Sequence, residues 1–84
     1  IGHAYPNPFN PSTTIEWSMK YADNHRIDIY NTNGQLLEVI SEGYVNPGYY
    51  QTTWDAHNYS SGVYIVRLIV GSDVIGTRKV MLVK

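Results

Sequence analysis

The sequence predicts an all-β protein, folded as an antiparallel β-sandwich of roughly six or seven strands. No segment of the 84 residues carries apolar side chains at the helical spacing of 3.6 residues. Several segments instead alternate apolar and polar residues, and turn-forming Gly, Pro and Asn recur about every eight to twelve residues. These features are typical of short strands joined by tight turns.

The longest apolar run extends from Val63 to Val70 and predicts a central strand. Because side chains alternate across a strand, we expect one face to point inward, namely Tyr64, Val66, Leu68 and Val70. The opposite face holds Val63, Ile65, Arg67 and Ile69. Gly71-Ser72 then predicts a two-residue hairpin turn, in which Gly71 supplies a positive φ. The chain returns as a last strand from Val74 to Lys84.

Two strands are predicted in the first half of the chain. Thr13 to Met19 alternates, and its apolar face holds Ile15, Trp17 and Met19. Polar turn residues follow from Tyr21 to Asn24. The next strand points Ile27 and Ile29 inward, and its other face holds Arg26, Asp28 and Tyr30.

A hairpin and a fourth strand come next. Asn31-Thr32-Asn33-Gly34 is a strong signal for a hairpin turn, and Gln35 to Ile40 is the expected return strand. Consecutive apolar residues in that strand break the alternation, so we expect either a β-bulge or coverage on both faces. Asn46-Pro47-Gly48 predicts another turn, after which Tyr50, Thr52 and Trp54 point inward. The expected core residues are Ile15, Trp17, Ile27, Ile29, Leu37, Trp54, Tyr64, Val66 and Leu68.

Residues 1–12 predict a proline-rich arm. Pro6, Pro8 and Pro11 each fix φ and remove an amide donor, so no central strand can run there. We expect Phe9 to insert into the core. The alternative is a polyproline-type ligand, based on the spacing in Pro8-Phe9-Asn10-Pro11.

Composition limits the function further. The chain is a single domain, residues 1–84, with a net charge of −1 and no basic cluster, which argues against nucleic-acid binding. It has no cysteine, so disulfides and thiolate metal sites are excluded. The longest apolar stretch, interrupted by Arg67, is far shorter than the ~20 residues that span a bilayer. We expect a monomer that does not span a membrane.

Five motifs occur in a characteristic order: Tyr5 to Ile15, Ile29-Tyr30-Asn31 with Gly34-Gln35, Trp54-Asp55, Ser61-Gly62-Val63-Tyr64 with Arg67-Leu68, and Lys79 to Lys84. Together they resemble the type A C-terminal sorting domain of type IX (Por) secretion cargo. The resemblance implies an immunoglobulin-like antiparallel β-sandwich that is no enzyme. The resemblance further implies that the domain directs a larger protein through an outer-membrane secretion translocon, by way of the periplasm, to the cell surface or the medium. In many cases a sortase-like peptidase then removes it.

The resemblance leaves alternatives open. The chain has Lys20 to Asp23 where the family often has a proline, and Tyr59-Ser60 where the family often has a leucine-alanine pair. Some of the motifs also resemble the Ig-like domain of flagellar hook-capping proteins. A structural Ig-like or fibronectin-like stalk, or a carbohydrate-binding module of an extracellular hydrolase, are the other candidates.

No cofactor, metal site or catalytic residue is predicted. His3, His25 and His57 lack ligand spacing and are expected at the surface, and no calcium-loop pattern surrounds Asp23, Asp28, Asp55 or Asp73, which we place in turns or on exposed strand faces. We expect Asp55 to bond within its turn. Ser60 and Ser61 have no orienting base. Tyr44, Tyr49 and Tyr59 could stack on sugars, but aromatic packing is the favoured interpretation.

The last strand is the predicted recognition element. Val80, Met81, Leu82 and Val83 are apolar in succession, so some must point outward or the strand must bulge. An unpaired edge here would let a receptor add a strand and contact the flanking Lys79 and Lys84, with Gly62 and Tyr64 holding the neighbouring strand. Alternatively, the lysines only discourage unwanted edge pairing. The secondary candidate is the arm, at Pro6, Asn7 and Pro8.

Overall fold

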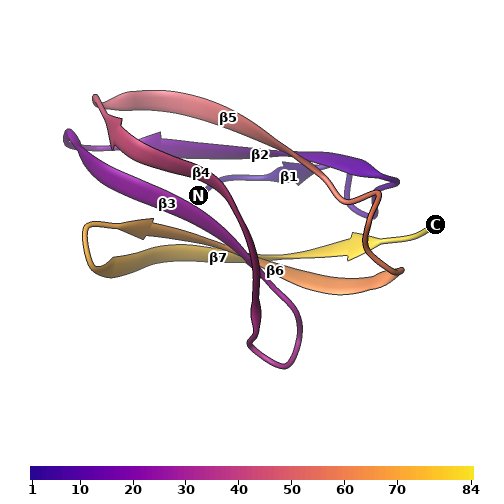
Figure 1. Ribbon diagram of the computed structural model, residues 1–84. Coiled ribbons are helices and arrows are strands. Elements are labelled where there is room, and N and C mark those ends of the chain that lie inside the picture. Colours follow the sequence, from indigo (N-terminus) through magenta and orange to yellow (C-terminus); the bar gives the residue numbers. More distant parts are fainter.

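The computed structural model describes residues 1–84 and contains seven strands and no helix. One sheet has the order β1-β2-β5, formed by β1 (Ala4–Tyr5), β2 (Ser12–Met19) and β5 (Gly48–Asp55). The other has the order β4-β3-β6-β7, formed by β4 (Leu36–Val45), β3 (Asp23–Tyr30), β6 (Gly62–Val70) and β7 (Asp73–Leu82). The two antiparallel sheets face each other, with β2 and β5 uppermost in Figure 1. The predicted all-β sandwich is therefore confirmed, and it holds no helix that could cross a membrane.

The strand order is that of an immunoglobulin-like sandwich in which one strand, β4, belongs to the second sheet instead of the first. β5 returns to pair with β2, and β6 returns to pair with β3, which are the long connections of a Greek key. In a constant-type immunoglobulin domain the fourth strand joins the first sheet, whereas β4 here lies beside β3. The turn at Asn46-Pro47 therefore carries the chain from one sheet to the other.

The β6–β7 hairpin has the predicted turn. Gly71 has φ of 62°, in the left-handed region that a side chain disfavours, and Val70 pairs directly with Asp73. The last strand thus begins one residue before Val74, where we expected it.

β4 contains two β-bulges. Of the two explanations offered for its consecutive apolar residues, a β-bulge or coverage on both faces, the structure therefore supports the bulge. Its register with β3 shifts between Ile27 and Asp28 and again between Ile29 and Tyr30. The skipped residues on β4 are Ile40 and Leu37, and both pack against the core. β4 also continues to Val45, beyond the predicted end of this strand.

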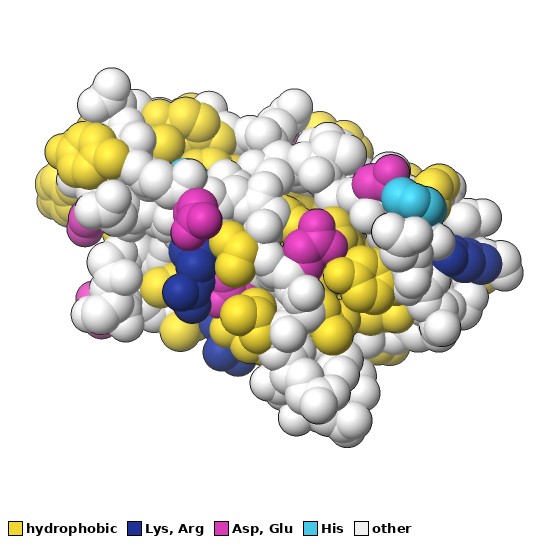
Figure 2. Space-filling view, viewed as in Figure 1, with side chains coloured by type: hydrophobic (Ala, Val, Ile, Leu, Met, Phe, Trp, Pro, Cys, Tyr) yellow, Lys and Arg dark blue, Asp and Glu magenta, His cyan; other side chains and the backbone are white.

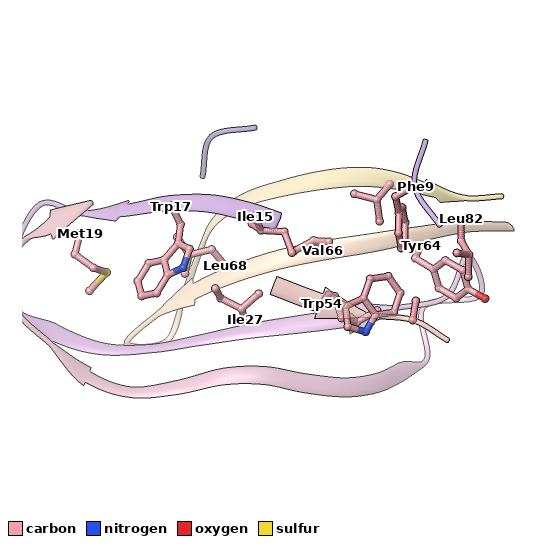
Figure 3. Close-up of a cluster of buried hydrophobic side chains, with 13 residues drawn as sticks. Phe9, Ile15, Trp17, Met19, Ile27, Trp54, Tyr64, Val66, Leu68 and Leu82 are labelled. Carbon is pink, nitrogen blue, oxygen red and sulfur yellow. The ribbon is translucent and has the colours of Figure 1, made fainter. Parts of the chain in front are cut away.

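The core between the sheets consists of 13 buried apolar residues, most of which are labelled in Figure 3. Eight of the nine predicted core residues are among them, and Leu37 is half-buried because it lies at a bulge. Phe9 from the arm is 2% exposed, as expected. The other members are Met19, Ala56, Val80 and Leu82.

Three polar side chains are buried, those of Thr13, His25 and Asp28, and two of them, His25 and Asp28, were expected to be exposed. His25 was expected at the surface but is 6% exposed, because it occupies an inward position of β3. Its ring stacks on Trp17 at 4.4 Å, and its nitrogens lie 2.7 Å from Gly43 O and from Ser41 Oγ. His3 and His57 are exposed, as predicted.

Asp28 is the other residue that was expected to be exposed. It does point to the outer face of β3, as the alternation requires, yet it is fully buried. Arg26 covers it with two hydrogen bonds of 2.7 and 2.9 Å, and the Tyr30 hydroxyl donates a third at 2.8 Å. The expectation of an exposed carboxylate was wrong because neighbouring side chains fold over it.

Candidate functional site

The proline-rich arm lies along the outer edge of β7, so the two ends of the sequence meet. Phe9 forms a parallel bridge with Leu82. The Phe9 N–H donates to Met81 O at 2.9 Å, and the Val83 N–H donates to Phe9 O at 3.0 Å. A short stretch of the arm thus behaves as an additional strand.

Asn7 extends this pairing with its side chain. Its Nδ2 donates to Lys79 O at 3.1 Å, and its Oδ1 accepts from the Met81 N–H at 2.9 Å. A carboxamide presents one donor and one acceptor, as a peptide group does, so Asn7 fills the place of a neighbouring strand at this point. The expectation of an unpaired edge is therefore wrong for residues 79–83. A receptor could add a strand there only after the arm had moved.

The arm is held in place by Phe9 and Pro6. The Phe9 ring inserts beside Trp54, at 5.6 Å between centroids, in the core end formed by the arm and the two sheets. The Thr13 hydroxyl donates to Pro6 O at 2.9 Å. Thr13 is buried, and alternation alone did not mark it as a contact for the arm.

Glu38 orders the aromatic residues around Phe9. Its Oε1 accepts hydrogen bonds from Trp54 Nε1 at 3.2 Å and from the Tyr59 hydroxyl at 2.9 Å. Burial, and then this bond to Glu38, raise the pKa of Tyr59 above its usual value. Tyr64 packs against both rings and donates its hydroxyl to Ser60 O at 2.6 Å. Tyr59 and Tyr64 are therefore packing residues.

A surface hollow of about 260 Å³ lies where the arm meets the terminal hairpin. Its lining residues are Asn7, Pro8, Val63, Lys79, Val80 and Met81. The structure thus brings residues from the primary and the secondary predicted sets into one site. Val63 was not in either set, although its outward position on β6 follows from the alternation that predicted the core.

The side chains of the last strand alternate without a bulge at the apolar run. Val80 and Leu82 are buried, whereas Met81 is 45% and Val83 51% exposed. Lys79 is exposed beside the hollow. This outcome confirms that some of the four apolar residues point outward.

Lys84 lies away from the hollow, against the loop before β6. Its Nζ donates to His57 O at 2.6 Å, and its backbone N–H donates to Ser61 Oγ at 2.9 Å. In the same loop Asp55 Oδ1 accepts from the His57 N–H at 3.0 Å, which lowers the pKa of Asp55 below its usual value. The predicted bond of Asp55 within its turn is confirmed.

The remaining surface offers little reactive chemistry. Histidine, aspartate and glutamate side chains form no group of three that could hold a metal ion. Tyr44 and Tyr49 are exposed, at 66% and 95%, and lie on different sheets. In the view of Figure 2, only a few basic side chains appear, most of them close to acidic ones.

The fold and the site define a small β-sandwich domain whose distinctive feature is a surface that joins its N-terminal arm to its last strand. Residues 3–83 match the family model for the secretion system C-terminal sorting domain. The chain belongs to this family, the C-terminal sorting domains of the type IX secretion system. Membership implies interaction with the type IX machinery and export to the cell surface or the medium. No curated protein and no solved structure gave a significant match.

Proposed function

We propose that this domain delivers a larger cargo protein across the outer membrane, and that the secretion machinery recognises it at the junction of the arm and β7. The observation that carries the proposal is the hollow around which residues 7–8 and 79–81 meet, although they lie at opposite ends of the sequence. The proposed site comprises Gly62, Tyr64 and Lys79 to Lys84, with Pro6, Asn7 and Pro8 from the arm.

The residues of this site have different roles. Met81 and Val83 offer exposed apolar contacts, and Lys79 adds a positive charge beside them. Tyr64 and Gly62 support the neighbouring strand, since Gly62 pairs with Leu82 and Tyr64 with Val80. The partner is the outer-membrane translocon, which receives the cargo from the periplasm. A sortase-like peptidase then separates the cargo from the domain.

The test is a fusion of the domain to a reporter with a signal peptide, expressed in a bacterium that has a type IX system. The wild-type fusion should appear at the cell surface or in the medium, and a Lys79→Glu variant should remain inside. Deletion of residues 79–84 is less informative, because it removes the buried side chains of Val80 and Leu82 and threatens the fold.

The matched control is Lys20→Glu, which reverses the charge of an exposed lysine in the β2–β3 turn. Thermal melting establishes that all variants are folded. Export of the folded Lys79→Glu variant at the wild-type level would place the recognition surface elsewhere. Retention of the wild-type fusion inside the cell would instead favour a passive stalk or a sugar-binding module.

A further inference from the structure

The outer face of the β4-β3-β6-β7 sheet carries several apolar side chains, although no other strand covers it. Val39 and Leu36 on β4 are 38% and 51% exposed, and Met81 on β7 is 45% exposed. Ile65 and Ile69 on β6 are half-buried between them. The solvated face of an antiparallel sheet is commonly polar, so this face has the character of an interaction surface.

A charged cluster lies in the middle of this face. The Asp28 carboxylate is fully buried there and receives two hydrogen bonds from Arg26 and one from the Tyr30 hydroxyl. The bond to Asp28 is the main cause that raises the pKa of Tyr30 above its usual value. Asp28 is therefore paired with these two residues, and neither of its oxygens is bonded to Arg67.

Arg67 is the member of the cluster without a partner. It lies directly across from Asp28 on β6, and its guanidinium carbon is 4.7 Å from the centre of the Tyr30 ring. Arg26–Asp28 is the one arginine–carboxylate ion pair of the domain, so no carboxylate lies within 4.0 Å of Arg67. Its Nε is buried without a hydrogen-bond acceptor. Unsatisfied buried donors are rare in folded proteins, and the Tyr30 ring lies against this guanidinium.

We propose that this face docks a segment of a partner protein that places an Asp or Glu carboxylate on Arg67, between aliphatic side chains. The planar guanidinium matches a carboxylate with two parallel hydrogen bonds, and arginine held on an aromatic ring is a common anchor of protein interfaces. Lys79 lies on the same face, two residues from Thr77, which pairs with Arg67. The two free cations thus favour an acidic partner, and the aliphatic flanks favour a protein over a phosphate.

The inference rests on the proposed function, because the acidic partner is a component of the secretion machinery. The face is continuous with the hollow at the arm, since Val63, Lys79 and Met81 belong to both. Arg67 would extend the contact of the partner from the edge of the sheet to its centre.

The decisive variant is Thr77→Glu, with Thr77→Gln as its matched control. Thr77 is exposed and directly opposite Arg67, so a glutamate there supplies an internal carboxylate that occupies the guanidinium. Thr77→Glu should melt at a higher temperature than Thr77→Gln. When both proteins also carry Arg67→Gln, their melting temperatures should be equal. Secretion of the reporter fusion should nevertheless fall about tenfold in Thr77→Glu, and remain near wild type in Thr77→Gln, because one lost ion pair of about 1.4 kcal/mol corresponds to that factor. A purely structural role of Arg67 would not separate stability from secretion in this way.

Arg67→Gln and Arg67→Lys complete the test. Arg67→Gln should reduce secretion about tenfold or more, and Arg67→Lys should lose less because it keeps the charge without the planar fork. Normal secretion of folded Arg67→Gln would overturn the inference. The inference would also be overturned if sedimentation showed that the purified domain is a dimer and that Arg67→Gln dissociates it, because the face would then bind a second copy of the domain. Failure of the wild-type fusion to be secreted concerns the proposed function instead, and the two failures are thereby distinguished.

Discussion

Replacing Asn7 by alanine tests the attachment of the arm to the last strand. The substitution removes the hydrogen bonds to Lys79 O and from the Met81 N–H, while the backbone bonds of Phe9 remain. Each such bond contributes about 0.5–1.5 kcal/mol, and both are exposed to water here, so the expected loss is about 1–2 kcal/mol. For a domain of this size that loss lowers the melting temperature by about 5–15 °C.

The assay combines thermal melting with amide hydrogen exchange. The Met81 amide should exchange faster in Asn7→Ala, whereas the Val83 amide, which donates to Phe9 O, should keep most of its protection. Asn58→Ala, in the exposed loop before β6, is the control and should leave both measurements unchanged. A melting temperature within about 2 °C of wild type, with Met81 still protected, would refute the role of Asn7 as a substitute strand.

Three further predictions concern the core, the pH dependence and a turn. Phe9→Ala should cost about 3–5 kcal/mol in urea unfolding, enough to unfold a large part of the population, because it empties the space beside Trp54; a loss below about 1 kcal/mol would contradict the core position of Phe9. The raised pKa of Tyr59 means that its stabilising contribution is complete below the unfolded pKa of about 10 and is lost as the pH rises through the folded value. Tyr59→Phe should therefore show a shallower loss of stability above pH ~10 than wild type, and equal slopes would show that the pKa of Tyr59 is not raised in the folded protein. Gly71→Ala should cost about 1 kcal/mol at its positive φ and Gly71→Asn less, and equal melting temperatures for all three proteins would argue against the turn geometry.

Much of the fold could be predicted because the strands obey simple alternation. In β2 and β6 every inward residue follows a period of two, so Ile15, Trp17, Val66 and Leu68 could be placed in the core without a structure. The bulges of β4 were predictable as a break in that alternation, but their positions depend on the register with β3. The end of β4 also depends on pairing, since no local signal stops the strand at Ile40.

Polar burial was not predictable from the same pattern. His25 lies at an inward position, but a polar side chain can be buried there only because Gly43 O and Ser41 Oγ on the neighbouring strand provide partners. Asp28 lies at an outward position and is covered by residues two places away on its own strand. In both cases the deciding contacts are side-chain contacts, which binary patterning does not describe.

The candidate site, like the fold, could be predicted only in part from the sequence. Sequence motifs indicated both the arm and the last strand, yet nothing in either segment showed that Asn7 would reach Met81. Alternation does not describe this proline-rich segment, so the edge on which it lies is decided by individual contacts, here those of Phe9, Asn7 and Pro6. A contact between the two ends of the sequence, such as that of the arm with β7, can be identified only from the complete fold.

The bridge between Phe9 and Leu82 has a consequence for the order of folding. A chain that emerges N-terminus first, from a ribosome or through a pore, exposes Phe9 long before its partner residues on β7 are available. The four-stranded sheet and the arm can close only when residues 73–82 have emerged, so folding of this domain is completed by nearly its last residues.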